Sequence, residues 1–530
     1  MELFKLDTPG IHERLRNNDV PSDTEKQSIR DSIETARTRL DALQNQGLLL
    51  DPEAQALSSY IAEYSSLLAP IRRLPVDLLR TIFLDPDIHE KKRDISRKSI
   101  LTEYKPNRLG AVSHHWRCVT LETATMWSAI AVFLHRPSRY SVDALRIALQ
   151  RSQNALLTLS FRPVSGSKTW SAIDTEMMHE VLQHAERWAV VDLSLQTVLL
   201  PHLSPAEGRL TNLHTLTLHD DPTFRFVETP ALAIIPKLRT LSIMHLSHLK
   251  MLPALPLSQL TRLSLNSNND NPDLYYHLFS QAQNIHHLSV RLFNLHPVIP
   301  PRPPVVSPHL QKMTLYGPGS DGAHEMDVLA RVTAPALRHF QAINLNYWDT
   351  PIMQAFVERS AFSLRTLVLY LVPTRVGELL DILRLLPTVE TLFLEDLIPN
   401  AITNAAMEVL TPPTEILLPA LSKFVLSGAY LFGEDRLLTM LESRITAANQ
   451  TAALDVVAIS LPHLILSAAS LQRLNTIRVL TTSFRLSYIN QGHRITMVEH
   501  GPHMGWIDEL RLEVKEVETS TQQIALMSAV

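Results

Sequence analysis

The sequence predicts an α/β protein in which a helical N-terminal region precedes an irregular solenoid with a curved parallel sheet. Three observations predict this fold class. Leucine is abundant while glycine is scarce, with 14 glycines in 530 residues. A short apolar phrase recurs through most of the chain after residue 150. The first 135 residues instead carry apolar side chains at helical spacing.

The recurring phrase places apolar residues at its first, fourth and sixth positions, as in Leu213, Leu216 and Leu218. Its central positions between residues 216 and 392 are 25, 22, 25, 25, 27, 27 and 25 residues apart. Periods of about 20–29 residues are typical of leucine-rich repeats. Each unit must stack on its neighbours to bury its apolar side. A doubly wound α/β sheet is the alternative, but it would not hold so regular a period.

The array becomes less regular near its ends. A copy of the phrase is expected at Leu474, Ile477 and Val479, and weaker copies at Leu454–Val456 and Ile507–Leu512. The asparagine that is common at the turn of the best-known repeats is mostly missing. We therefore expect a degenerate array with longer excursions between its strands.

Residues 22–70 are expected to form two helices packed as a hairpin. Ser22 and Glu25 have the spacing of a capping box at a helix start. Apolar residues from Ile29 to Leu43 follow at alternating spacings of 4 and 3, and a second such seam runs from Leu57 to Ile71. A dimeric coiled coil is the alternative, but about two heptads per helix is short for one.

A small helical module is expected next, because two apolar stripes follow one another between residues 71 and 135. They hold more apolar surface than two short helices can bury against each other, and such a surplus usually marks a partner-binding face. Leu78, Leu79, Ile82 and Phe83 form the first stripe, and Val112, Trp116 and Val119 form the second.

The pattern Leu-Pro-x-acid-Leu-Leu-x-x-Ile-Phe, answered later by Val-x-x-x-Trp-Arg, resembles an F-box. Together with the hairpin before it and the repeat after it, it resembles the F-box proteins abundant in mushroom-forming fungi. By this resemblance eight residues form either the core of the F-box or its adaptor face, namely Leu74, Pro75, Leu78, Leu79, Ile82, Phe83, Val112 and Trp116. Asp77 stands where glutamate is commoner. The insert 85–108 is longer than the usual link, so it forms a loop or replaces the middle helix.

The resemblance implies a substrate receptor of a Skp–cullin–F-box ubiquitin ligase. The F-box would dock on the Skp-family adaptor and through it on a cullin, and the repeats would hold an unknown target protein for degradation. A repeat scaffold with a vestigial F-box and no ligase is the alternative. The resulting segments are an N-terminal tail 1–21, the hairpin 22–70, the F-box region 71–135, the leucine-rich-repeat-like solenoid 136–514 and a C-terminal tail 515–530.

The outward-facing positions of the strands are the expected target surface, because they line a continuous sheet face. Basic and histidine side chains from Arg262 to His339 favour an acidic or phosphorylated segment. A generic solvated sheet face is the alternative. The candidate residues are Arg262, His287, Arg291, Lys312, Tyr316, His339, Tyr370 and Phe393.

Composition argues against nucleic-acid and membrane partners, and the absence of catalytic motifs described below favours a non-catalytic protein. The net charge of -4 is too close to neutral for a typical nucleic-acid binder. The single cysteine, Cys118, excludes a disulfide framework and a Cys-rich zinc site. The N-terminal residues lack the apolar core of a secretory signal, and no segment has the length of a membrane helix. We therefore expect an intracellular protein, cytoplasmic or nuclear.

No motif proposes a catalytic residue, a cofactor site or a metal site. The basic cluster Lys91–Lys98 is more typical of a solvated loop than of a nuclear address. Gly317–Gly322 lacks the Lys-Ser/Thr pair that follows a phosphate-binding loop. An enzyme remains a third alternative, and it would require a pocket with convergent polar groups.

Overall fold

The computed structural model divides the chain into two compact units. The first comprises Met1–Val191 with Arg209–Asn212, and the second comprises Asp192–Gly208 with Leu213–Val530. The cluster Lys91–Lys98, the repeat copy Ile507–Leu512 and both tails lie outside the described residues, apart from the last residues of the N-terminal tail. The described ranges are 20–45, 52–85, 105–134, 139–163, 171–195, 200–220, 230–244, 255–267, 272–292, 303–317, 325–398, 401–412, 417–446, 452–461, 466–490 and 493–499.

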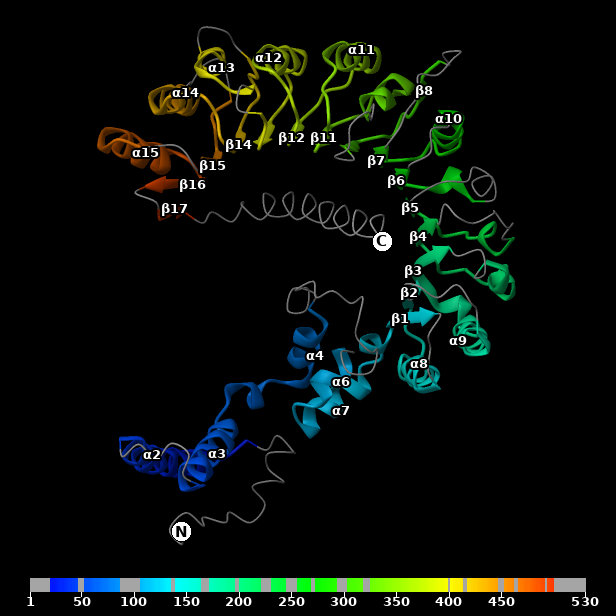
Figure 1. Cartoon of the computed structure of the whole chain (residues 1–530), viewed down its shortest axis with the longest axis vertical. Helices are drawn as coiled ribbons and strands as arrows, with labels where there is room; N and C mark the ends of the chain where they lie inside the picture. Colours follow the sequence, from blue (N-terminus) through cyan, green and yellow to red (C-terminus); the bar gives the residue numbers. More distant parts are fainter. Residues whose placement is uncertain are drawn as a thin grey trace. The chain divides into compact units, whose positions relative to one another are not determined.

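The first unit begins with helices and continues into strand–helix alternation (Figure 1). Strands β1 and β2 pair in parallel, and β1 falls at the end of the segment expected to be the F-box region. The elements are α2 (Asp23–Asn45), α3 (Pro52–Leu67), η1 (Pro70–Arg73), α4 (Val76–Leu84), α6 (Lys105–Gly110), α7 (His114–Glu122), η3 (Ala124–Trp127), β1 (Ala129–Leu134), α8 (Arg139–Arg151), β2 (Leu157–Pro163), α9 (Ala172–Leu182), η4 (Ala185–Arg187) and β3 (Trp188–Leu195), the last crossing the unit boundary.

The N-terminal hairpin is confirmed. The backbone N–H of Ser22 donates to Glu25 Oε2 at 2.8 Å, and the Glu25 N–H donates to Ser22 Oγ at 3.4 Å, which is the expected capping box. Early α2 residues such as Ile33 pack on late α3 residues such as Tyr64, so the helices run antiparallel. Further along α2, Ala36 and Leu43 pack on Ala54 and Leu57.

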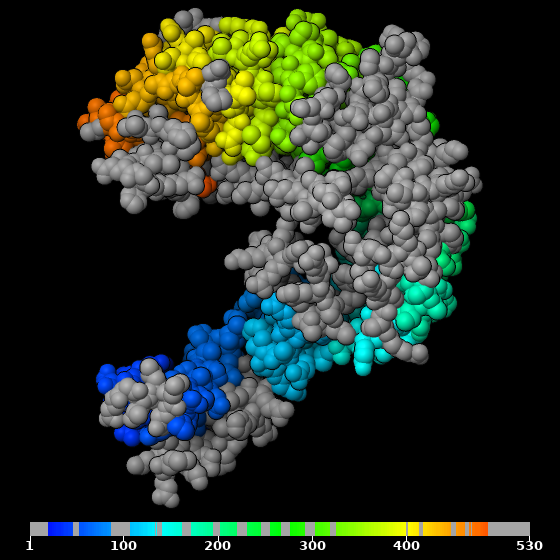
Figure 2. All heavy atoms as spheres, viewed as in Figure 1, coloured from blue at the N-terminus to red at the C-terminus, as the bar shows by residue number. Residues whose placement is uncertain are grey.

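The second unit alternates strands with helices or 3-10 turns. Figure 1 shows helices α10 to α15 on one side of its strands, and Figure 2 shows the yellow and orange repeats stacked directly on each other. The strands are β4 (Thr215–Asp220), β5 (Thr240–Met244), β6 (Arg262–Ser267), β7 (His287–Leu292), β8 (Val305–Val306), β9 (Lys312–Tyr316), β10 (Val332–Thr333), β11 (His339–Ile343), β12 (Thr366–Tyr370), β13 (Thr391–Glu395), β14 (Lys423–Ser427), β15 (Val456–Leu461), β16 (Ser483–Asn490) and β17 (His493–Glu499). The helices are α10 (Pro272–Gln281), α11 (Thr350–Ser360), α12 (Val376–Leu385), α13 (Asn404–Val409), α14 (Glu434–Thr446) and α15 (Ala468–Leu480), with 3-10 turns η5 (Leu200–Ala206), η6 (Pro230–Leu232), η8 (Leu257–Gln259) and η9 (Glu325–Arg331).

A long parallel sheet forms the second unit, which confirms the α/β class. Its strand order is β4-β5-β6-β7-β9-β11-β12-β13-β14-β15-β16-β17, and only the β16–β17 pair in this run is antiparallel. β8 and β10 form a separate two-stranded sheet. The central phrase positions align strand to strand, as Leu241 pairs Leu263 and Leu367 pairs Leu392. These side chains are buried on the helix side of the sheet.

Two details differ from the expected strands. Residues Leu474, Ile477 and Val479 were expected in a strand but lie in helix α15. The apolar spacing of three residues is common to the strand phrase and to one face of a helix, so it did not distinguish the two. The last two strands, β16 and β17, follow that helix and carry no copy of the phrase.

The turn after each central strand repeats the same backbone geometry. Asn344, Leu371 and Asp396 follow β11, β12 and β13 with φ of 52°, 50° and 48°. The backbone N–H of each donates to the carbonyl oxygen of the last residue of the next strand. The acceptors are Tyr370, Glu395 and Ser427, at 2.7, 3.0 and 2.8 Å respectively. After β14, Gly428 makes the corresponding bond with a different φ of 132°, and its N–H donates to the carbonyl of Ser460, next to the last residue of β15, at 3.0 Å. We call this series of bonds the turn ladder.

Gly317 occupies the same position after β9, and its N–H donates to the Ile343 carbonyl at 2.9 Å. A Cβ at Gly317 would lie 1.9 Å from the Asn344 carbonyl oxygen, which is backbone and cannot move aside. Gly317→Ala is therefore expected to destabilise the second unit by about 1–3 kcal/mol through overpacking. The free energy of urea unfolding measures this. Gly377→Ala is the control, since nothing lies within 4 Å of a Cβ there.

Candidate protein-interaction surfaces

Helix α4 packs on α7 through an aromatic contact. Leu79 and Phe83 lie one turn apart and are buried. The ring centroids of Phe83 and Trp116 are 4.7 Å apart, and Trp116 is half-buried. Ser113 caps α7 by accepting the Trp116 N–H at 3.1 Å, which fixes the start of that helix. The same sequence stripe therefore builds the core of the module.

The remaining motif residues stay accessible on this module. Leu78 is 51% exposed and Val112, in the turn between α6 and α7, is 61% exposed. Pro75 is exposed, while Leu74 and Ile82 are half-buried. The structure thus divides the eight predicted residues into a core set and an accessible set. Most of the insert, residues 86–104, lies outside the described ranges, and its last residues belong to helix α6.

A row of basic and histidine side chains crosses the first half of the sheet in the second unit. Arg262, His287, Lys312 and His339 are direct neighbours at one register position on β6, β7, β9 and β11. Burial is the first cause that lowers the pKa of His287, followed by the positive charges of Arg262 and Lys312. The pKa of His339 is lowered by burial and then by Lys312. Both imidazoles therefore favour the neutral form, and an anion bound here would favour their protonation.

The other predicted surface residues separate into two groups. Tyr316 and Tyr370 are half-buried and sit two strands apart, with buried Ile343 between them in register. Arg291 is only 4% exposed, with its guanidinium carbon 5.8 Å from the Tyr316 ring centroid. Phe393 is 0% exposed. Arg291 and Phe393 therefore do not belong to an open surface, which corrects the expectation for these two residues.

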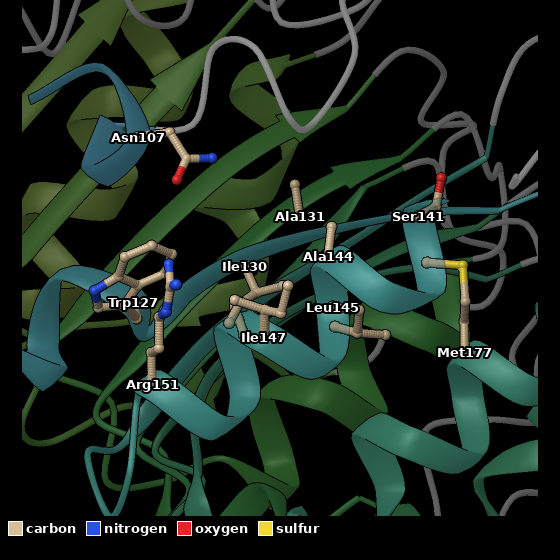
Figure 3. Close-up of a pocket in the computed structure, with 11 residues that line it drawn as sticks. Asn107, Trp127, Ile130, Ala131, Ser141, Ala144, Leu145, Ile147, Arg151 and Met177 are labelled. Carbon is tan, nitrogen blue, oxygen red and sulfur yellow. The ribbon is translucent and has the colours of Figure 1, made fainter. Parts of the chain in front are cut away.

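A small pocket of about 120 Å³ lies in the first unit between η3, β1 and α8 (Figure 3). The guanidinium carbon of Arg151 stands 4.4 Å from the Trp127 ring centroid at one end. Ile130, Leu145 and Met177 make most of the lining apolar. Arg151 is the only ionisable side chain among the described lining residues, so they provide no acid–base pair.

One buried carboxyl was not predicted from the sequence. Glu325 is buried at the start of η9, and burial raises its pKa to about 7. Its Oε1 accepts the Asn346 N–H at 3.4 Å, whereas Oε2 is buried without a hydrogen-bond partner among the described residues. A single acid at the start of a 3-10 turn carries no sequence signal that would distinguish it from exposed acids.

The described ranges contain no group of three or more His, Cys, Asp or Glu side chains arranged to hold a metal ion. Among the described helices, none has the length and apolar character needed to cross a membrane.

No protein-family model matches this chain, and no curated protein sequence matches it. Among solved structures, the chain is similar to the leucine-rich repeat-containing protein LegL7 from Legionella pneumophila. The identity is 15% and the TM-score 0.32, over 67% of this chain and 97% of that one. A protein from Bacteroides fragilis is 12% identical with a TM-score of 0.26, over 64% of this chain and 76% of that one. At these TM-scores neither structure defines the function of this chain.

Proposed function

We propose that this chain is a non-catalytic substrate-recognition subunit of a Skp–cullin–F-box ubiquitin ligase. In this proposal the α4–α7 module is the F-box. The strand–helix units of the second unit form a leucine-rich-repeat-like array that binds the target protein. The complex would act in the cytoplasm or the nucleus.

The observation that carries the proposal is the division of the motif residues on α4. Leu79 and Phe83 supply the core with Trp116, while Leu78 beside them remains 51% exposed. A helix that keeps a large apolar side chain in solvent after completing its core is suited to a partner. Val112 adds a second accessible apolar side chain to the same module.

The second unit supports the protein-binding part of the proposal. Its parallel strands present the same register positions side by side, so neighbouring side chains form rows that a protein segment can contact. The row from Arg262 to His339 suits an acidic or phosphorylated segment. The mechanism is tethering, because holding target and ligase on one chain raises the effective concentration of target lysines near the transferring enzyme.

Leu78→Asp tests the proposal. We expect it to reduce co-purification of a Skp-family adaptor and its cullin about tenfold or more, because a charge replaces an apolar contact at an interface. Leu84→Asp is the matched control, since Leu84 is 43% exposed on the same helix but is not a motif residue. Affinity purification with mass spectrometry quantifies both, and thermal unfolding verifies that each variant folds.

Two results would contradict the ligase assignment. One is equal adaptor recovery by wild type, Leu78→Asp and a Leu74→Ala/Pro75→Ala double variant. The other is that none of these chains recovers an adaptor while all of them recover the same other proteins. That result would favour a repeat scaffold without a ligase.

A further inference from the structure

The pocket in the first unit has a buried floor and an accessible rim. The side chains of Trp127, Ile130 and Leu145 form the floor and are 3–5% exposed. The rim includes Ala144, which is half-buried, and Ile147, which is 43% exposed. The pocket therefore opens to solvent above a fixed apolar base. We call it the Trp127 pocket.

Arg151 supplies a positive charge at one end of the Trp127 pocket. Its guanidinium carbon lies 4.4 Å from the centroid of the Trp127 ring, which is a cation–π distance. The indole is itself held, because its Nε1–H donates to the carbonyl of Thr120 at 2.7 Å. Among the described residues Arg151 forms no ion pair, whereas Arg146 on the same helix pairs with two glutamates of α9. The Arg151 guanidinium is thus held in place and can pair with an anion from solvent.

The volume of the Trp127 pocket limits the size of a ligand. The pocket measures about 120 Å³. An apolar cavity of about 150 Å³ binds benzene, whereas drug-sized ligands occupy pockets of roughly 300–1,000 Å³. The Trp127 pocket therefore holds a single ring, and it is too small for a nucleotide.

The lining favours an aromatic ring over an aliphatic chain. Figure 3 shows Trp127 and Arg151 together at one end of the pocket and Met177 toward the other. An indole packs well against a second aromatic ring, and a thioether sulfur makes favourable contacts with ring edges. An aromatic ring can therefore gain specific contacts at both ends of the floor.

We propose that the Trp127 pocket binds a small aromatic carboxylate. The ring of the ligand lies on the floor between Trp127 and Met177, and its carboxylate accepts hydrogen bonds from the guanidinium of Arg151. Guanidinium and carboxylate groups are planar and pair through two parallel hydrogen bonds, which orients the ligand as well as binding it.

A bound ligand contacts two separate parts of the first unit. Asn107, which also lines the pocket, belongs to α6, while Arg151 is the last residue of α8. Because the ligand binds the folded chain, it also stabilises that unit against unfolding. This binding does not depend on the ligase function proposed above.

Titration of the full chain with phenylacetate, followed by ligand-observed NMR, tests the site. We expect a dissociation constant below about 1 mM, which is reasonable for a ligand of about ten non-hydrogen atoms. Phenylacetamide keeps the ring without the charge, and acetate keeps the charge without the ring. Each should bind at least about tenfold more weakly than phenylacetate, because each loses one of the two contacts.

Variants of α8 locate the binding. Arg151→Met keeps an apolar stem over Trp127 and removes the charge, so phenylacetate should bind it about tenfold more weakly, as phenylacetamide binds wild type. Gln150→Met is the matched control, since Gln150 is exposed on the same helix and does not line the pocket. It should bind phenylacetate as wild type does. Ala144→Leu fills the pocket from its rim and should abolish binding, and it carries the test if Arg151→Met does not fold.

Thermal unfolding verifies that each variant folds. Equal phenylacetate binding by wild type and Ala144→Leu would overturn the proposal, because the probe would then bind elsewhere. Equal affinity of wild type for phenylacetate and phenylacetamide would also overturn it, because Arg151 would then contribute nothing, and so would a lack of phenylacetate binding. Adaptor recovery measured on the same variants reports the proposed ligase function separately.

Discussion

Arg444→Met is expected to destabilise the second unit by about 3–5 kcal/mol, because it removes the donor of three buried hydrogen bonds at once. Arg444 is fully buried on α14 and donates to the carbonyls of Leu410, Leu417 and Leu418. These carbonyls belong to the long excursion between β13 and β14. Methionine fills a similar volume but donates no hydrogen bond, so the three acceptors would lose their partner.

Urea unfolding measures the change in free energy. Arg436→Met on the same helix is the matched control, because Arg436 is exposed and its loss should change stability by less than about 0.5 kcal/mol. Burial lowers the pKa of Arg444 to about 10, so the guanidinium stays charged at neutral pH. An Arg444→Met variant as stable as wild type would show that the carbonyl bonds contribute nothing net, as happens when a well-packed apolar side chain replaces a buried charge.

The second large effect is a pH dependence that Glu325 produces. Its pKa is raised by burial to about 7, against 4.5 for an ordinary glutamate. Between these values the folded chain holds a proton that the unfolded chain releases, so the stabilisation is complete below about pH 4.5 and is lost as pH rises through about 7. The shift corresponds to up to about 3 kcal/mol.

Glu325→Gln keeps the shape and removes the titration. We expect wild type to lose stability relative to Glu325→Gln as the pH rises from 5 to 8, measured as the difference between their urea midpoints. Glu358→Gln on α11, an exposed position, should follow wild type at every pH. A constant difference between wild type and Glu325→Gln would contradict the raised pKa.

The regular part of the fold was predictable because burial on one side of each strand imposes the apolar period. The exceptions are local. Leu474 and Ile477 lie three residues apart, a spacing that a strand phrase and a helical face share, and the structure places them in a helix. Likewise, Leu78, Leu79, Ile82 and Phe83 crowd one helical face in the sequence, and the structure buries Leu79 and Phe83 but leaves Leu78 exposed. Spacing alone cannot select which residues of such a broad apolar face enter the core.

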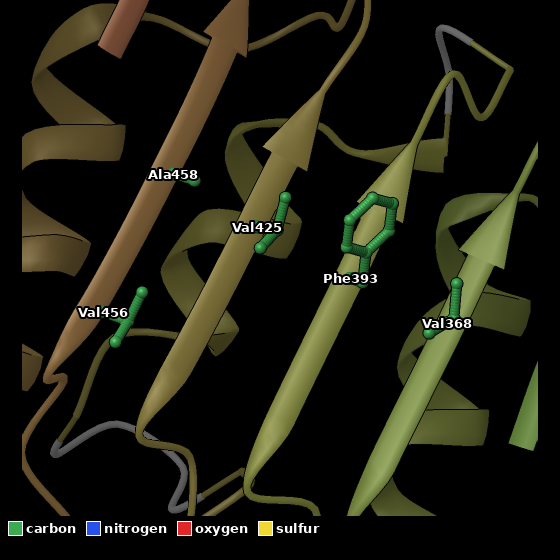
Figure 4. Close-up of a cluster of buried hydrophobic side chains, with 5 residues drawn as sticks. All are labelled: Val368, Phe393, Val425, Val456 and Ala458. Carbon is green, nitrogen blue, oxygen red and sulfur yellow. The ribbon is translucent and has the colours of Figure 1, made fainter. Parts of the chain in front are cut away.

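For the candidate surface, the sequence predicts which face of the sheet each side chain lies on, but not whether that side chain is exposed to solvent. Alternation along a strand assigns Phe393 to the side away from the helices, and it lies there (Figure 4). Its side chain is nevertheless 0% exposed, and alternation along one strand does not report how closely the neighbouring side chains pack around it. Arg291 is likewise 4% exposed, although the same alternation assigns it to an accessible position.

The turn ladder has a consequence for how the second unit unfolds, under mechanical force or after a destabilising substitution. Each bond joins one repeat only to the next, as Leu371 does with Glu395 and Asp396 with Ser427. When each repeat is coupled only to its neighbours, a substitution that disrupts one turn destabilises the adjacent repeats and leaves distant repeats folded. Pulling on the protein by its ends should therefore release it in discrete steps, and amide exchange should spread outward from the weakest turn.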